Sequence, residues 1–240
     1  MKKLLVLVSA LVLVSCNKFK VDGTTVGVKD GTKVFLVTSD STGTPKPKDT
    51  VEVKNNKFEF EGKNELPEIA YLSFDGVQNG SIPFVIENGT VDIVFDTKTV
   101  QNTKIGGTDN NDLFQQFNNN GVEVQKKVKA VFEKNKEFMS KEPVTEEEKA
   151  KATLIMGELK KYQTEMDKKS EDFIAKNKTT FIALLLTENL FYNGKMKATK
   201  AKEVYEGLSD DLKKTTSAKS VKKYLDTQLP LENMNPEKKK

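Results

Sequence analysis

The sequence predicts an α+β protein, with an N-terminal antiparallel β-sandwich followed by an α-helical C-terminal half. Up to about Gly107, apolar and polar residues alternate in short runs separated by turn residues, as in strands with one buried face. From Thr108 onward, apolar residues recur at the spacing of amphipathic helices. We therefore expect a sandwich domain over residues 16–107 and a helical domain over residues 108–230.

The predicted strands are short, and two turns between them stand out. Asn55-Asn56 separates two alternating runs and predicts a hairpin. Asn88-Gly89 predicts a second hairpin, because Asn-Gly is a strong signal for a tight turn between paired strands. A further strand is expected after Asp30-Gly31. In order, the expected strands are residues 34–37, 51–53, 58–60, 69–74, 82–86, 91–95 and 103–105.

Two long helices are predicted at the start of the C-terminal half. Thr108 or Asp109 can cap the first helix, and Pro143 ends it. Thr145 and Glu148 have the spacing of a capping box, which opens the second helix. The apolar stripe of the first helix is Val124, Val128, Val131 and Phe138, and that of the second is Ile155, Leu159, Tyr162, Met166 and Phe173.

A third helix is predicted to be the buried one. Residues 181–192 are apolar on nearly every side, so this helix must be covered by more than its helical neighbours. The sandwich offers the nearest additional surface. Shorter helices are expected near residues 201–208 and 217–229, and a disordered tail is expected at residues 231–240.

The first 15 residues have the features of a signal peptide. Lys2 and Lys3 precede an apolar run of eleven residues, which is well short of the roughly 20 residues that a membrane-spanning helix needs. The run ends in Leu13-Val14-Ser15-Cys16, which resembles the lipobox of bacterial lipoproteins, and Cys16 is the sole cysteine of the chain. We expect cleavage before Cys16 and lipid attachment to it. The alternative is an ordinary secreted protein with an unrelated cysteine.

The resemblance to a lipobox also implies a location. It implies three acyl chains on Cys16, and burial of their methylenes at about 0.8 kcal/mol each would make membrane attachment effectively permanent. Asn17 stands where an aspartate would resemble the inner-membrane retention signal of some diderm bacteria. Residues 17–20 also lack the acidic cluster that resembles a surface-export signal in Bacteroidota lipoproteins. We therefore expect a protein of the cell envelope, anchored in the outer membrane and facing the periplasm.

The composition excludes several kinds of chemistry. Hydrophobic residues make up 36% of the chain, charged residues make up 31%, and the mean hydropathy is -0.54, which is typical of a soluble body. The formal charge of +4 falls to +2 when the two leader lysines are removed. Because the chain has no arginine, we expect no nucleic-acid partner. The lack of histidine and the single cysteine exclude a Ser-His-Asp triad, an imidazole zinc site and a Cys-x-x-Cys redox pair, and we expect no cofactor.

Several motifs together resemble a known family. They are residues 31–36, 49–53, 57–62, 84–89 and 105–110, which read GTKVFL, DTVEV, KFEFEG, FVIENG and IGGTDN. They resemble the domain of unknown function found in Bacteroidota lipoproteins, where it often precedes a thioredoxin-like domain. Residues 173–177 and 181–186 resemble the helical connector of those proteins. The resemblance implies a fold and a location, and it carries no active site.

The longer members of that family are thiol-disulfide oxidoreductases, but this activity is not expected here. The sequence ends near Lys240, where the thioredoxin-like domain would begin, and the redox cysteines of that domain are absent. We therefore expect a protein that lacks the thioredoxin-like domain.

Other polar and aromatic clusters are interpreted as structural. Residues 109–112 could offer oxygen ligands, but they lack the spacing and the glycine of a calcium loop, so we interpret them as a helix start. Residues 146–148 and 210–211 are acidic and also fall at predicted helix starts, where they complement the helix dipole. The alternating phenylalanines could line a ligand slot, but we interpret them as core; they are Phe58, Phe60, Phe84 and Phe95.

These patterns favour a non-catalytic binding or interaction module over an enzyme. The sandwich, or its junction with the helices, would bind a peptide, a glycan or another envelope protein. One alternative is a hydrolase that uses carboxylates alone, which would need a cleft with at least two acids of displaced pKa. Another alternative is an accessory subunit of a separate thioredoxin-like oxidoreductase. The sequence shows no catalytic or metal-binding residue, and its one expected site residue is Cys16.

Overall fold

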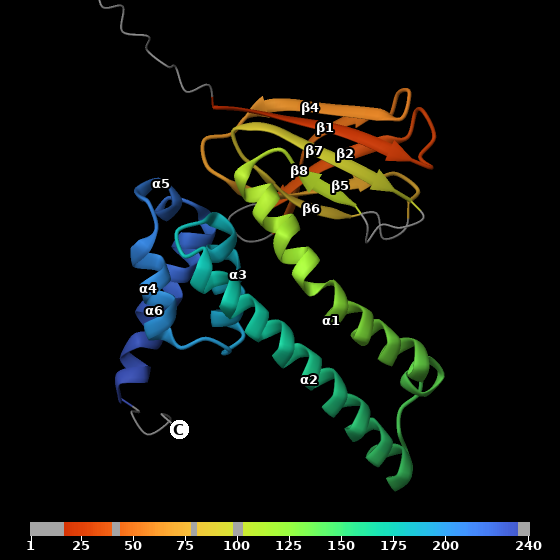
Figure 1. The fold of residues 1–240 in the computed structure, drawn as a ribbon, viewed down its shortest axis with the longest axis vertical. Helices are drawn as coiled ribbons and strands as arrows, with labels where there is room; N and C mark the ends of the chain where they lie inside the picture. The colour runs from red at the N-terminus through yellow and green to blue at the C-terminus, as the bar shows by residue number, and fades with distance from the viewer. Residues whose placement is uncertain (1–16, 40–43, 78–80, 98–102, 235–240) are drawn as a thin grey trace, which may run out of the picture.

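The structure is a computed structural model that describes residues 17–39, 44–77, 81–97 and 103–234 (Figure 1). The expected signal peptide at residues 1–15 and Cys16 lie outside the described residues, as do residues 235–240. A sandwich of two sheets is followed by a helical half, with about 52% helix and 27% strand. The predicted α+β fold class is therefore confirmed.

The described strands form two four-stranded sheets. Sheet A has the order β4-β1-β7-β8, and sheet B has the order β3-β2-β5-β6. All neighbouring pairs are antiparallel except β1 and β7, which run parallel. The strands are β1 (Lys18–Val26), β2 (Lys33–Ser39), β3 (Pro45–Glu52), β4 (Lys57–Lys63), β5 (Glu68–Phe74), β6 (Ile82–Ile86), β7 (Gly89–Asp96) and β8 (Lys104–Gly106).

The turn predicted at Asn55-Asn56 is present, but it joins the two sheets. Lys54 and Lys57 donate backbone hydrogen bonds to each other across it, at 2.8 and 3.0 Å. Both asparagines have positive φ, 52° and 61°, as a tight type I′ turn requires. Beyond the turn the two arms separate, because β3 pairs with β2 and β4 pairs with β1. The turn therefore connects an edge of sheet B to an edge of sheet A.

The second predicted hairpin is wrong. β6 pairs with β5 in sheet B, whereas β7 pairs with β1 and β8 in sheet A. Gly89, with φ of 114°, lies where the chain crosses from one sheet to the other. Both strands turn their apolar residues toward the space between the sheets, so their alternation predicts the buried face correctly. It does not predict which strand each one pairs with.

The phenylalanines of the strands form the core between the sheets. Phe74 and Phe95 stack with ring centroids 4.3 Å apart, and Phe58 meets Phe74 edge-on at 5.5 Å. Phe60, Phe84 and Phe95 are at most 1% exposed. Their interpretation as core residues is confirmed.

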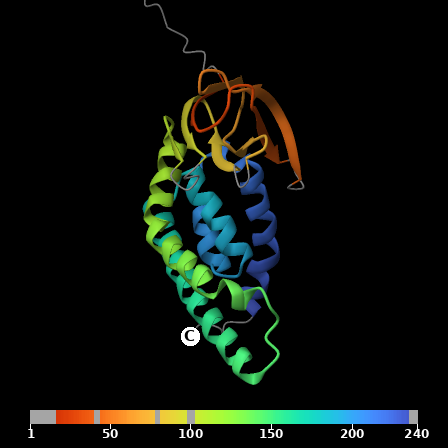
Figure 2. The same ribbon diagram turned by 90° about the vertical axis from the view of Figure 1, so that its right-hand side faces the viewer.

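Six described helices follow the strands: α1 (Asp109–Met139), α2 (Glu146–Lys176), α3 (Phe181–Tyr192), α4 (Ala198–Gly207), α5 (Asp210–Lys213) and α6 (Thr216–Met234). α1 and α2 form a long antiparallel hairpin that projects from the sandwich, and α3 to α6 gather beside it (Figures 1 and 2). None of the helices in the described ranges is long and apolar enough to cross a membrane.

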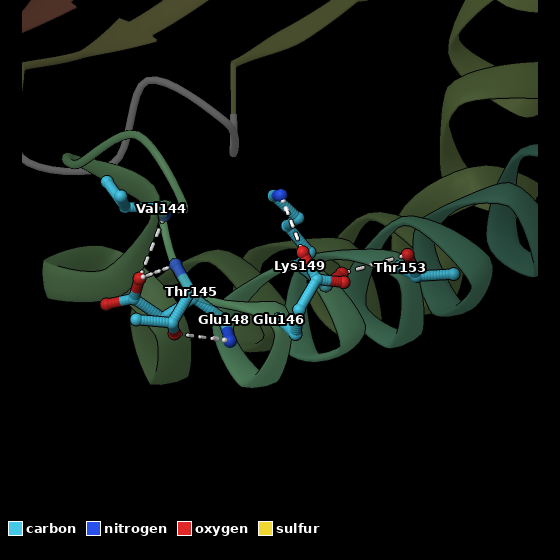
Figure 3. Close-up of polar contacts among 6 residues, drawn as sticks. All are labelled: Val144, Thr145, Glu146, Glu148, Lys149 and Thr153. Atoms are coloured by element: carbon cyan, nitrogen blue, oxygen red, sulfur yellow. Dashed lines mark hydrogen bonds and ion pairs between the residues drawn. The ribbon is translucent and has the colours of Figure 1, made fainter.

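The predicted capping box opens α2 (Figure 3). The backbone N–H of Glu148 donates to the Thr145 hydroxyl at 3.2 Å, and the backbone N–H groups of Val144 and Thr145 donate to the Glu148 carboxylate at 2.9 Å. These bonds satisfy amide groups that a helix start otherwise leaves without partners. They also hold the pKa of Glu148 below its ordinary value, because its carboxylate accepts both backbone hydrogen bonds.

The last helix is longer than predicted. α6 continues through Pro230 to Met234, so residues 231–234 of the expected tail are helical. A proline lacks the N–H that would bond to the preceding turn, but it does not stop the residues after it from remaining helical.

The helical half packs against the outer face of sheet B. α3 lies at the centre of the helical core, where Ile182, Ala183 and Leu184 are at most 1% exposed. Val85 of β6 belongs to this core although it lies on a strand, and Ile69 of β5 packs against it. The sandwich therefore covers part of the helical core.

Candidate functional site

The start of α1 fastens the helices to the edge of sheet B. Asn111 is fully buried, and its carboxamide faces the backbone of Val85 on β6. The N–H of Val85 donates to Asn111 Oδ1 at 2.9 Å, and Asn111 Nδ2 donates to the Val85 carbonyl at 2.8 Å. The side chain thus takes the place of a neighbouring strand and satisfies the free edge of β6.

The other residues of this segment also have structural partners. Asn110 donates its backbone N–H to Glu87 Oε1 at 3.0 Å, and its side-chain amide bonds to the same carboxylate. Asp112 accepts from the Gly107 N–H at 3.1 Å. Gly107 has φ of 90°, and a Cβ there would lie 2.5 Å from the Thr90 carbonyl oxygen, so a side chain does not fit. Residues 109–112 therefore start a helix, as the sequence indicated, and they also dock it on sheet B, which the sequence did not predict.

A cleft of about 710 Å³ lies where the sandwich meets the helices, and we call it the junction cleft. Its floor includes Ile69 and Tyr71, on the outer face of β5. The cleft is also lined by α3 and by the segment from Lys214 to Ser220, which leads into α6. The full lining is Ser39, Asn64, Glu65, Leu66, Pro67, Glu68, Ile69, Tyr71, Phe181, Leu185, Glu188, Lys214, Thr215, Thr216, Ser217, Lys219 and Ser220.

The loop that precedes β5 is held in place over the cleft. The Asn64 side-chain amide donates to the carbonyl of Leu66 within the loop and to that of Ile86 at 3.1 Å. At the end of the loop, Glu68 forms an ion pair with Lys48 at 2.8 Å. This side of the cleft is therefore preorganised by bonds to two different strands.

The segment that leads into α6 is fixed by helix capping. The Thr215 hydroxyl accepts from the Ala218 N–H at 3.3 Å and donates to the Leu212 carbonyl at 2.6 Å. Lys214 pairs with Asp211 at 2.7 Å, and this hydrogen bond holds the pKa of Lys214 above its ordinary value. A cationic side chain thus stands at the rim of the cleft.

Glu188 is the half-buried acid of the cleft. Burial raises the pKa of its carboxyl, and a hydrogen bond with Ser217 opposes that rise. Glu65 is exposed, and Glu68 is engaged with Lys48. Among the described residues, no group of three or more His, Cys, Asp or Glu side chains could hold a metal ion. The lining therefore suits binding through apolar side chains, hydroxyls and lysines.

A second hollow, of about 740 Å³, lies over the outer face of sheet A. Its side chains are mostly charged, and they already pair with one another, as Lys20 does with Asp22 at 2.9 Å and with Glu59 at 2.8 Å. These exposed pairs are typical of a solvated sheet face. The junction cleft is the better candidate because it combines apolar and polar groups from both halves of the chain.

The cleft residues were not predicted individually from the sequence. The expectation of a site at the junction of the two halves named no residue, and the one named site residue, Cys16, lies outside the described residues. Glu188 gave the clearest signal that could have been used, since it is the one acid inside a predicted helix that is mostly apolar. Tyr71 and Asn64 gave none, because the role of Tyr71 depends on where α3 and α6 pack and that of Asn64 depends on the position of β6.

A family comparison matches the N-terminal part of the chain. Residues 19–114 match the model described as Domain of unknown function (DUF4369). The matched region contains the strands of the sandwich and the first residues of α1, including Asn111. No match was found among curated proteins or among solved structures.

Proposed function

We propose that this protein is a cell-envelope lipoprotein, anchored through Cys16 to the outer membrane and facing the periplasm. Its body would be a non-catalytic module that binds a segment of another envelope polypeptide in the junction cleft. The lipobox-like motif at residues 13–16 supports the anchor. The match of residues 19–114 supports the relation to the Bacteroidota lipoproteins whose motifs the sequence resembles.

The junction cleft is the observation that carries the proposal. The loop before β5 and the segment that leads into α6 are both held by hydrogen bonds within the protein, so little ordering is needed when a ligand binds. Ile69 and Leu185 offer apolar surface. The hydroxyls of Ser217 and Ser220 bond to Glu188 and Tyr192, and each keeps further hydrogen-bonding capacity for a peptide backbone. Tyr71, which is 38% exposed, adds an aromatic side chain of the kind that dominates many binding interfaces.

Lipid attachment gives the first test of this proposal. Mass spectrometry of the mature N-terminus should find acylated Cys16 and none of residues 1–15. The Cys16→Ser variant should lose the acyl mass and leave the membrane fraction. An unmodified Cys16 in mature protein, or a leader that is retained, would contradict the anchor.

Peptide selection tests the binding site. Peptides that cover the envelope proteins of the source organism would be displayed and selected on the full chain, and their affinities would then be measured. Tyr71→Ala should weaken the selected peptides by about tenfold or more, as expected for an aromatic anchor. Val94→Ala is the control, because Val94 is 44% exposed on the other sheet. Equal loss in both variants, or no loss in either, would contradict a site in the cleft.

Carboxylate chemistry is the second candidate, and the raised pKa of Glu188 is the observation that favours it. A general acid in this position would act on a ligand held against α3. Glu188→Gln keeps the size of the side chain but removes its ability to act as a general acid or base. If the chain turns over a bound peptide or glycan and this variant abolishes the turnover, the non-catalytic proposal is wrong.

A further inference from the structure

The first residue that the structure describes, Asn17, directly follows the proposed lipid-attachment site at Cys16. β1 starts one residue later, at Lys18. Asn17 is itself part of the fold, because its carbonyl accepts a hydrogen bond from the Asn64 N–H at 3.0 Å. One residue spans at most about 3.6 Å, so no linker separates an acylated Cys16 from the sandwich. The lipid anchor would therefore hold the end of sheet A that carries Asn17 and Lys18, which we call the anchor end, against the bilayer surface.

The pairing of β4, β1 and β7 arranges the outward side chains of sheet A in rows. These residues alternate along each strand with buried ones, so they share the outer face of the sheet. In order from the anchor end, the rows are Lys18 and Lys63; Lys20, Glu61 and Thr90; Asp22, Glu59 and Asp92; and Thr24, Lys57 and Val94.

The rows nearest the anchor end are basic, and the third row is acidic. The first two rows together carry three lysines and one glutamate, a net charge of +2, whereas the third row carries three acids. Lys20 forms ion pairs with Asp22 at 2.9 Å and with Glu59 at 2.8 Å, and both of these acids belong to the third row. Within the described ranges, no ion pair involves Lys18 or Lys63. The first row therefore presents two lysines that are available to an anion.

The acids that follow β4 in the chain do not neutralise these lysines. Glu65 lines the junction cleft, and Glu68 forms an ion pair with Lys48. Glu61, in the second row, is the one acid in the first two rows, and it faces Lys20 across the β1–β4 pair. The excess of positive charge at the anchor end is therefore not cancelled by the neighbouring loop.

Lys18 and Lys63 occupy directly facing positions of paired strands, and like charges in such positions destabilise the pairing. Both side chains are exposed. A hollow of about 600 Å³ lies at this end of the sheet, and its lining includes both lysines and Thr90. Lysine binds phosphate as a point charge, so a phosphate group between the two side chains relieves their repulsion. The arrangement thus fits an anionic headgroup better than it fits bare solvent.

The distances along β1 match the depth of a bilayer surface. The headgroup layer is about 5 to 7 Å thick on each side of the hydrocarbon core. Lys18 is two residues from Cys16, at most about 7 Å along the chain, so the first row lies at the level of the headgroups. Asp22 is six residues from Cys16, about 20 Å along the strand. Because this exceeds twice the Debye length of about 8 Å, an anionic surface repels the acidic row little.

We propose that the anchor end is a membrane-contact surface, at which Lys18 and Lys63 bind phosphate groups of anionic phospholipids in the leaflet that holds Cys16. This inference rests on the proposed anchor, and it adds which side of the body faces the membrane. It does not depend on what binds in the junction cleft. Figures 1 and 2 show the tip of the α1–α2 hairpin at the end of the molecule opposite to the start of β1, so the hairpin extends away from the bilayer.

Fluorescence quenching in vesicles tests which part of sheet A lies at the membrane. Lipidation occupies the only cysteine of the natural chain, so an introduced cysteine can be labelled selectively. Thr90→Cys and Val94→Cys place the label on the same face of β7, about 13 Å apart along the strand. The lipidated full chain is reconstituted in vesicles of phosphatidylcholine and phosphatidylglycerol that contain a lipid with a spin-labelled headgroup. The label at Thr90 should lose most of its fluorescence, and the label at Val94 should keep it.

Flotation of the same vesicles separates this inference from the anchor. If the protein floats with the vesicles and both labels are quenched equally, or Val94 is quenched more, the contact surface is overturned and the anchor stands. If the protein does not float with the vesicles, the anchor is wrong and the contact surface falls with it.

Neutralisation of single lysines tests the role of charge. Lys63→Gln removes a lysine of the first row, and Lys57→Gln is the matched control, because Lys57 is also exposed on the outer face of β4 but lies in the fourth row. Fluorescence lifetimes of the Thr90 label give the ratio of molecules in contact with the headgroups to molecules that are not. Lys63→Gln should lower this ratio by about fivefold when phosphatidylglycerol is present, and Lys57→Gln should leave it unchanged.

Two controls keep this result specific. Because Lys63→Gln removes a like-charge pair, its melting temperature in detergent should be equal to or higher than that of the wild-type chain, so a loss of contact does not reflect unfolding. In vesicles of phosphatidylcholine alone, Lys63→Gln should have no effect. An equal loss in both lysine variants, or a loss that is the same with and without phosphatidylglycerol, overturns the proposal.

Discussion

Asn111→Ala is expected to lower the free energy of unfolding by about 2 to 5 kcal/mol. The variant leaves the N–H and the C=O of Val85 without partners in a buried position, and each unsatisfied group carries a desolvation cost. Chemical denaturation followed by circular dichroism measures the loss. Asn120→Ala on the same helix is the control, because Asn120 is exposed and should change stability little. Equal stability of the two variants would contradict a docking role for Asn111.

Asn111→Asp refines the same test through its pH dependence. The carboxylate keeps the acceptor for the Val85 N–H but places a charge against the Val85 carbonyl in a buried site, so its pKa should be raised. A raised pKa means that the folded state holds the proton more tightly than the unfolded state. Lowering the pH should therefore recover part of the stability loss relative to the wild-type chain at the same pH. A loss that grows as the pH falls would contradict this geometry.

Leu184→Ala is expected to cost about 2 to 5 kcal/mol, since it opens a cavity at a position that is fully buried. Its neighbour Leu185 is only partly buried and lines the junction cleft, so Leu185→Ala should cost less, about 1 to 2 kcal/mol. Because Val85 and Ile69 of sheet B pack on the helical core, Leu184→Ala should also lower the stability of the strands. Hydrogen exchange of amides in β5 and α3 should report one shared transition. Independent transitions would show that the halves fold separately.

The sequence predicts most elements of this fold because the signals are local. The capping box at Thr145 and Glu148 lies within one helical turn, and the turn at Asn55-Asn56 needs only two residues that tolerate positive φ. The apolar residues on nearly every side of α3 likewise predict its burial without reference to any partner. Such features depend on the backbone near each residue, and they are read correctly from one sequence.

Pairing and docking are not local, and here the sequence was insufficient. The alternation in β6 and β7 is the same whether these strands form a hairpin or belong to opposite sheets. Asn111 looks like an ordinary residue of a helix start, yet its two bonds reach Val85, 26 residues earlier in the chain. Glu188 becomes a cleft residue only because α6 begins beside it. These roles require the positions of other elements, which periodicity does not provide.

Hydrogen exchange of the full chain, with and without a selected peptide, tests the binding proposal most directly. The account predicts that the peptide protects three segments that are distant in sequence and meet only at the junction cleft, residues 64–71, 181–188 and 214–220. The exchange rates of amides in the strands of sheet A and at the far end of the α1–α2 hairpin should be unaffected. Protection that is confined to those regions, with the three cleft segments unchanged, would contradict the claim that the junction cleft is the binding site.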